Sequence, residues 1–173
     1  PRAREDGSFA RQYGVFVGAL LAYRRAERLR PRGGGQALET RAFDYATAAE
    51  EAPALQRLTA LALAAARVGG LGGGSGVAHA LGAAEVVLCA ALDAGADALR
   101  LFRAESDAVA ALLDAYGGRD ISAPRAAAAW VETFAGRMRQ AAQLQEALGT
   151  VHEALEARAG ASPAALAAAR ASG

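Results

Sequence analysis

The pattern of hydrophobic and polar positions near the start of the chain predicts a long amphipathic helix. Its apolar residues recur at intervals of three and four, the spacing of one helix face: Phe9, Tyr13, Phe16, Val17, Leu20 and Leu21. Ser8 can cap the first turn, and Pro31 interrupts the pattern just after Arg30. We therefore expect the first helix to run from Ser8 to about Arg30.

The next segments are punctuated by proline and glycine. We expect a short helix from Thr40 to Ala49 and another that begins at Pro53, because proline is favoured at the first position of a helix. The apolar residues after this proline keep helical spacing: Leu55, Leu58, Leu61, Ala62 and Ala65. The sequence from Val68 to Gly76 reads VGGLGGGSG, and we interpret it as a flexible connection.

Two long helical patterns fill the second half of the chain. From Val77 to Tyr116 the apolar spacing predicts a central helix. Gly95 within it costs about 1 kcal/mol relative to alanine, so it marks a bend or a division into two helices. Pro124 starts a final helix that ends near Gly160. Its apolar stripe is long: Trp130, Phe134, Met138, Ala141, Leu144, Leu148, Val151 and Leu155.

These elements predict an all-α fold of antiparallel helical hairpins, stacked as a short α-solenoid or as a bundle. Hydrophobic residues make up 53% of the chain but aromatic residues only 6%, so alanine-rich helices must pack closely. We expect one domain over residues 1–160 and an Ala-rich tail over 161–173 that can form a short helix. Because the sequence begins at Pro1, we expect it to be part of a longer protein.

Charge and cysteine content narrow the setting. All 19 basic residues are arginines, and 18 acidic residues bring the net charge to +1, which argues against a nucleic-acid partner. The single cysteine, Cys89, cannot form an internal disulfide and favours a reducing, cytoplasmic location. The longest apolar region contains Glu85, Asp93 and Asp97, so we expect no transmembrane helix.

The sequence offers no pattern that is typical of catalysis or metal binding. The only histidines are His79 and His152, and neither has the setting of a general base beside Cys89 or Ser75. The Gly70–Gly76 stretch lacks the lysine of a phosphate-binding loop and the preceding strand of a dinucleotide site. We therefore expect no enzyme activity, no metal and no cofactor.

Two features favour a binding function. The first helix carries Arg24, Arg25 and Arg28 near its end, where they can contact an anionic surface or, alternatively, complement the negative end of the helix dipole. The two long C-terminal helices form an antiparallel pair whose groove fits an amphipathic helix from a partner. Alternatively, their apolar stripes only form the core.

Several segments resemble, in order and spacing, the second half of the ANTH domains of the clathrin-assembly adaptor family. The match as a whole spans most of the region from Phe9 to about Val151, and six segments carry it: Phe9–Tyr13 (FARQY), Tyr23–Arg24, Glu51–Gln56 (EAPALQ), Asp97–Phe102 (DALRLF), Leu112–Tyr116 (LLDAY) and Phe134–Met138 (FAGRM). The resemblance implies the helical fold of the C-terminal part of an ANTH domain. It also implies an endocytic adaptor that is cytoplasmic and peripheral to clathrin-coated pits and vesicles.

The resemblance further implies partners. In the family, a groove in this half of the domain receives a helix of a VAMP-type R-SNARE, and its groove-lining leucine and methionine fall on Leu113 and Met138. The family's helices that bind phosphoinositide membranes and its tail that binds clathrin and clathrin adaptors have no counterpart here, so these contacts are implied only for the full-length protein. The alternative function is a structural scaffold subunit of a larger assembly that reuses the ANTH-like fold.

Overall fold

The computed structural model describes residues 2–28, 42–72, 76–83, 85–117 and 124–160. Within these ranges the chain is helical and has no strand, which confirms the predicted all-α class. The elements are α1 (Arg2–Arg28), α2 (Tyr45–Ala66), the π-helical turn η2 (Arg67–Leu71), α3 (Gly76–Gly82), α4 (Glu85–Gly117) and α5 (Pro124–Gly160). The predicted tail over 161–173 lies outside the described residues.

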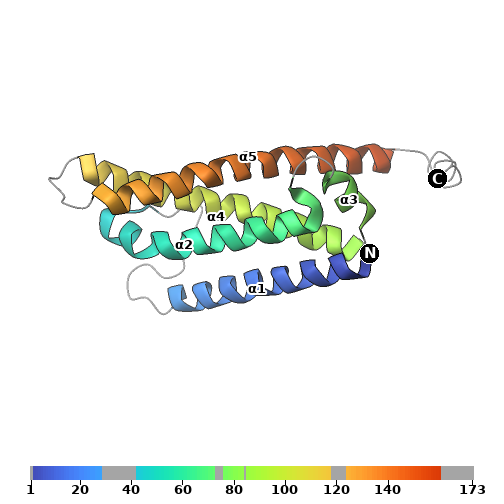
Figure 1. The fold of residues 1–173 in the computed structure, drawn as a ribbon, viewed down its shortest axis with the longest axis horizontal. Helices are drawn as coiled ribbons and strands as arrows, with labels where there is room; N and C mark the ends of the chain where they lie inside the picture. Colours follow the sequence, from blue (N-terminus) through green and yellow to red (C-terminus); the bar gives the residue numbers. More distant parts are fainter. Residues whose placement is uncertain (1, 29–41, 73–75, 84, 118–123, 161–173) are drawn as a thin grey trace, which may run out of the picture.

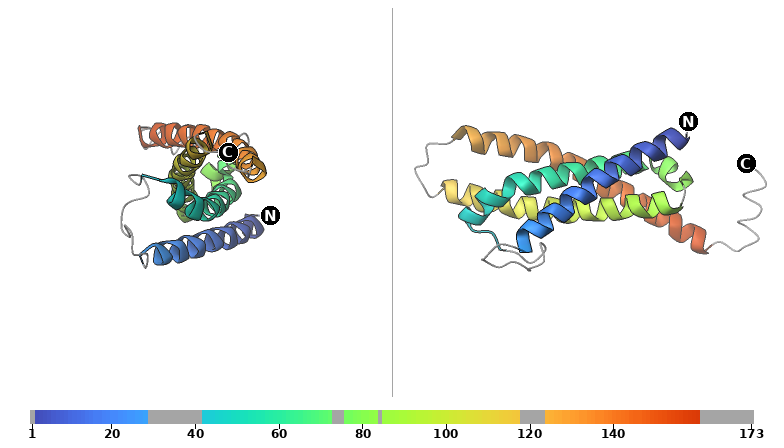
Figure 2. Two further views of the ribbon diagram at one scale, coloured as in Figure 1. Left: turned by 90° about the vertical axis from the view of Figure 1, so that its left-hand side faces the viewer. Right: turned by 90° about the horizontal axis from the view of Figure 1, so that it is seen from below.

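The long helices form a bundle of three layers (Figure 1). Helices α2 and α4 lie side by side in the middle layer, with α1 against one side and α5 against the other, as the end-on view in Figure 2 shows. Successive long helices run in opposite directions, so each connection links antiparallel neighbours. The predicted antiparallel arrangement therefore takes the form of a bundle.

The seam between α2 and α4 is built from small side chains, as the composition predicts. Eight alanines of these two helices are 0% exposed: Ala48, Ala52, Ala62, Ala65, Ala91, Ala94, Ala98 and Ala108. Alanine lets helix backbones approach closely without any loss of side-chain entropy. Larger side chains close the core at its margins, and Phe16 of α1 is the largest of those that are fully buried.

Helix α1 is longer at its start than predicted. It begins at Arg2 and not at Ser8, which is an exposed residue within the helix, and it ends at Arg28. Phe9, Phe16 and Tyr23 face the core at intervals of seven residues. The placement of Leu21 on the apolar face was wrong, because it is 62% exposed. Leu21 lies two residues before Tyr23, which turns it about 200° away around the helix.

Helix α2 is one helix where the sequence predicts two. It begins at Tyr45, and Asp44 caps it by accepting a hydrogen bond from the backbone N–H of Thr47 at 2.8 Å. Pro53 is therefore inside the helix and is not its first residue. The buried residues on both sides of Pro53, Ala52 and Leu55 among them, hold the helix against α4 in spite of the missing backbone N–H.

The described part of the glycine-rich segment is packed and is not a flexible connection. Gly69, Gly70 and Leu71 are buried in the π-helical turn, and Gly70 has a φ of 93°, which favours glycine. A Cβ on Gly69 would lie 2.6 Å from the Cβ of Ala91, so only glycine fits between the turn and α4. The prediction failed because these glycines allow a close approach of backbones and a positive φ within a packed turn.

The expected alternative of two helices divided at Gly95 is wrong, because α4 continues through this residue. The predicted central helix is instead divided near residues 83–84, where α3 ends and α4 begins. Gly95 leaves room for neighbours: a Cβ there would lie 3.2 Å from both Leu71 and Leu148 side-chain atoms. Helix α5 runs from Pro124 to Gly160, as predicted.

Candidate functional site

The contact between α4 and α5 contains an aromatic pair and a buried ion pair. The rings of Phe102 and Phe134 are stacked, with centroids 5.3 Å apart and an interplanar angle of 8°. One helix turn further along each helix, a guanidinium N–H of Arg137 donates to Oε1 of Glu105, whose side chain is 0% exposed. These two pairs hold α4 and α5 together.

The two residues that the family resemblance singles out lie on the surface of this helix pair. Leu113 on α4 is 44% exposed, and Met138 on α5 is 52% exposed. Their neighbours on the core side, Leu112 and Ala141, are buried. Neither Leu113 nor Met138 is therefore enclosed in the seam between α4 and α5, and both present apolar surface to solvent.

Leu113 and Met138 do not meet at a single point. Leu113 lies beyond the two contact pairs toward the end of α4, and Met138 lies beyond them in the opposite direction along α5. At a rise of 1.5 Å per residue, they are separated by roughly 14–22 Å along the helix axes. This spacing corresponds to about three to four turns of a helix laid across both.

The predicted anionic-surface residues are at the last turns of α1. The side chains of Arg24 and Arg25 are exposed, and Arg28 is the last residue of the helix, with a side chain outside the described part. This position agrees with contact to an anionic surface and equally with the helix dipole. Both interpretations stay predictions.

Two of the residues that sequence analysis considered for chemistry are exposed, on different helices. Cys89 is exposed on α4, and His152 is exposed on α5, where its Nε2 lies 3.2 Å from a carboxylate oxygen of Glu156. The side chain of His79 lies outside the described residues. Among the residues whose placement is described, no group of three or more His, Cys, Asp or Glu side chains could hold a metal ion.

In the described ranges, every helix is too short or too polar to cross a bilayer.

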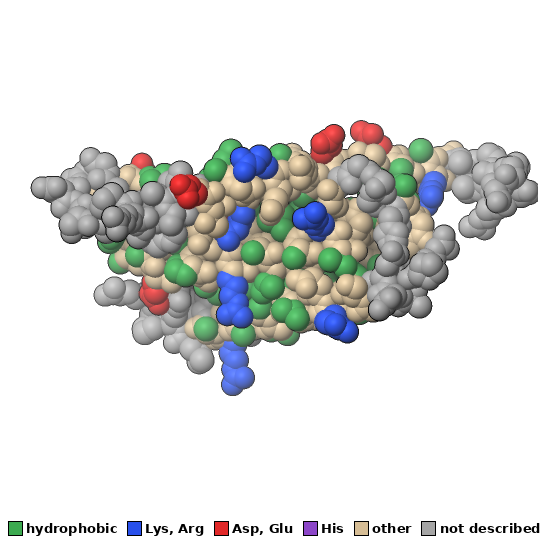
Figure 3. Space-filling model, in the orientation of Figure 1, with side chains coloured by type: hydrophobic (Ala, Val, Ile, Leu, Met, Phe, Trp, Pro, Cys, Tyr) green, Lys and Arg blue, Asp and Glu red, His purple; other side chains and the backbone are tan. Residues whose placement is uncertain are grey.

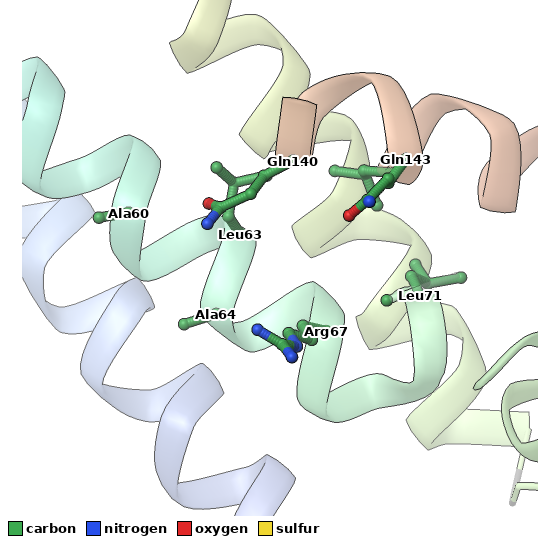
Figure 4. A pocket seen from close by; sticks show the side chains of 9 residues that line it. Ala60, Leu63, Ala64, Arg67, Leu71, Gln140 and Gln143 are labelled. Carbon is green, nitrogen blue, oxygen red and sulfur yellow. The ribbon is translucent and has the colours of Figure 1, made fainter. Parts of the chain in front are cut away.

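Sequence reasoning missed a pocket between the end of α2 and the middle of α5. Its volume is about 430 Å³, and Figure 4 shows the side chains around it. Nine residues from α2, the π-helical turn and α5 line it: Ala60, Leu63, Ala64, Arg67, Leu71, Gly72, Gln140, Gln143 and Leu144. The lining segments are far apart in sequence, and no motif connects them.

The fold thus defines the chain as an all-α helical bundle with an exposed apolar surface on α4 and α5. In comparisons with known proteins, no family model matches the sequence, and no curated protein or solved structure is significantly similar to it. The likeness to ANTH domains accordingly rests on the sequence segments quoted above.

Proposed function

We propose that this protein is an adaptor module that binds an amphipathic helix of a partner along the exposed side of α4 and α5. The observation that carries the proposal is the exposure of Leu113 and Met138 on adjacent antiparallel helices. Large apolar side chains are costly to leave in water, and an exposed pair on neighbouring helices suits the apolar stripe of a docked helix.

Ordered contacts beneath this surface support the same function. The Phe102–Phe134 stack and the Glu105–Arg137 ion pair hold the two helices together, so the surface does not need to form when the partner arrives. Between these pairs and Leu113, the hydroxyl of Ser106 donates to the carbonyl oxygen of Phe102 at 2.8 Å. That donor is already satisfied and imposes no desolvation cost on an apolar partner.

The exposed fractions set the scale of affinity. Complete burial of a leucine or methionine side chain stabilises by about 1.5–3 kcal/mol, so the roughly half that is still exposed contributes about 1 kcal/mol for each residue. Two such contributions do not offset the cost of association by themselves. We therefore expect further contacts with the partner along the turns between Leu113 and Met138. We also expect the complex to be reversible, as an adaptor requires.

The resemblance to ANTH domains supports a specific partner and setting. The partner is a VAMP-type R-SNARE helix, and the setting is cargo selection at clathrin-coated membranes on the cytoplasmic side. In this proposal, phosphoinositide and clathrin contacts are made by other regions of the full-length protein. The alternative is permanent incorporation as a scaffold subunit.

Binding of a fluorescent VAMP-type R-SNARE helix, followed by anisotropy, tests the proposal. Leu113→Ser and Met138→Lys should each weaken binding by at least about fivefold, since about 1 kcal/mol of burial is lost in each. Val86→Ser is the matched control, because Val86 is on α4 and is 80% exposed, but lies in its first turn, at the opposite end from Leu113. Circular dichroism should show unchanged helicity in all three variants.

Equal affinity in the wild type and in both surface variants would refute the adaptor proposal. A stoichiometric partner that copurifies with the protein and survives high salt would instead favour the scaffold alternative.

A further inference from the structure

The pocket at the end of α2 has an apolar floor and a polar rim. The floor consists of three buried leucines: Leu63, Leu71 and Leu144. Three longer polar side chains, Arg67, Gln140 and Gln143, also line the pocket; in Figure 4 the amide ends of Gln140 and Gln143 extend from α5 toward α2, and the side chain of Arg67 lies along α2. A volume of about 430 Å³ lies within the range of about 300–1,000 Å³ that is usual for small-molecule sites.

The arginine at the rim is positioned by the glycine-rich turn. Arg67 is the first residue of the π-helical turn, and its aliphatic stem folds over Gly72: a Cβ on Gly72 would lie 2.9 Å from Cγ of Arg67. The floor below is fixed in the same way, since Leu71 packs against Gly95 of α4. Gly70 breaks the helical backbone within this turn, with a φ of 93°, so the chain is kinked directly after Arg67 and Val68.

Arg67 is an exposed residue at the pocket. No carboxylate lines the pocket, and Arg67 has no ion-pair partner among the residues that the structure describes. On the face shown in Figure 3, arginine side chains lie across the middle, whereas acidic side chains lie toward the upper edge and the left end. Such a distribution attracts an anion to the middle of this face.

From these features we infer that the pocket binds a small amphipathic carboxylate of the medium-chain fatty acid type. The guanidinium of Arg67 pairs with the carboxylate, for which its planar fork of donors is suited. The side-chain amides of Gln140 and Gln143 donate further hydrogen bonds, and the aliphatic chain lies over the leucine floor. This pocket is separate from the partner-helix surface on α4 and α5.

The two surfaces are on different sides of α5. At 100° per residue, Gln140 and Gln143 lie on one flank of the buried stripe of α5, and Met138 lies on the other. Ligand binding at the pocket and helix binding at α4 and α5 can therefore be measured separately. Failure of one proposal leaves the other standing.

Titration of the ¹⁵N-labelled protein with sodium octanoate tests the inference. Saturable shifts are expected in the backbone amides of Leu71, Gly72 and Gln143. Arg67→Met should weaken octanoate binding by about tenfold, because it removes a charge-assisted hydrogen bond while keeping the length of the side chain. Arg57→Met is the matched control, since Arg57 is an exposed arginine of α2 that does not line the pocket.

Two further measurements separate the role of charge from that of shape. 1-Octanol should bind more weakly than octanoate to the wild type and should be insensitive to Arg67→Met. Ala60→Trp, at the mouth of the pocket, should block both compounds while Arg67 is retained. Absence of saturable shifts with octanoate, or equal octanoate affinity in the wild type and Arg67→Met, would overturn the inference.

Discussion

The ion pair between α4 and α5 allows a quantitative test of how the bundle is held together. Glu105 is 0% exposed and Arg137 is 14% exposed, so both charges are largely withdrawn from water. The second carboxylate oxygen of Glu105, Oε2, has no hydrogen-bond partner among the described residues. Arg137 therefore provides the compensating charge for the buried carboxylate of Glu105, and Arg137→Met removes it.

The expected magnitude follows from this burial. Removing one partner of a buried ion pair costs about 3–5 kcal/mol, because the other charge stays in a medium of low polarity. A domain of ordinary stability has about 5–15 kcal/mol in total, so Arg137→Met should bring the bundle close to unfolding. The double variant Glu105→Leu/Arg137→Met removes both charges and should be about as stable as the wild type, or more stable.

Urea unfolding followed by circular dichroism measures these differences directly. Arg139→Met is the control, because Arg139 is exposed on the same helix and its replacement should change stability by less than about 0.5 kcal/mol. A cost below about 1 kcal/mol for Arg137→Met would be typical of a surface pair and would refute the reasoning. The reasoning would also be refuted if the double variant lost as much stability as Glu105→Leu and Arg137→Met lose together when each is made alone.

Other predictions concern packing and buried hydrogen bonds, and each is measured by urea unfolding. Gly69→Ala should destabilise by about 1–3 kcal/mol, because its Cβ would overlap Ala91. Gly14→Ala, at an exposed helix position with open space, should instead stabilise by about 0.5–1 kcal/mol; equal effects of the two changes would contradict the packing account. Tyr23→Phe should cost about 1.5–3 kcal/mol, because Tyr23 donates to Oε2 of the buried Glu51 at 3.0 Å; a neutral effect would show that this bond is unimportant.

The extent to which the fold could be predicted varied with the kind of signal. Helix α5 was predicted at both ends because a strong apolar stripe agrees with Pro124 at its start and Gly160 at its end. Helix α2 was divided wrongly at Pro53, since a local preference of proline was outweighed by buried contacts with α4. Such contacts are between residues distant in sequence, and a local pattern does not contain them.

Glycine was the main source of error. The Gly-rich segment suggested a flexible connection and Gly95 suggested a bend, yet Gly69 and Gly95 are positions where neighbouring helices approach closely. Composition alone does not distinguish a glycine needed for conformational freedom from one needed for space. The distinction requires knowledge of which side chain lies opposite, such as Ala91 or Leu148.

The two candidate sites also differ in how far the sequence could predict them. Leu113 and Met138 were chosen through the family resemblance, and the apolar pattern alone would have assigned Met138 to the core stripe, where it is not. The pocket was not predicted, since Arg67 and Gln143 come from segments that only the tertiary fold brings together. An arginine directly before a glycine-rich run was the one signal that could have drawn attention to it.

Mapping the position of the bound partner tests whether α4 and α5 together bind a helix. A VAMP-type R-SNARE peptide is added to the ¹⁵N-labelled protein, and amide shifts are measured along every helix. We expect the shifts to concentrate around Leu113 and Met138 and in the turns between them, with Val86 and Arg67 unaffected. Shifts confined to α1 or to the α2 pocket, or no saturable shifts, would contradict it.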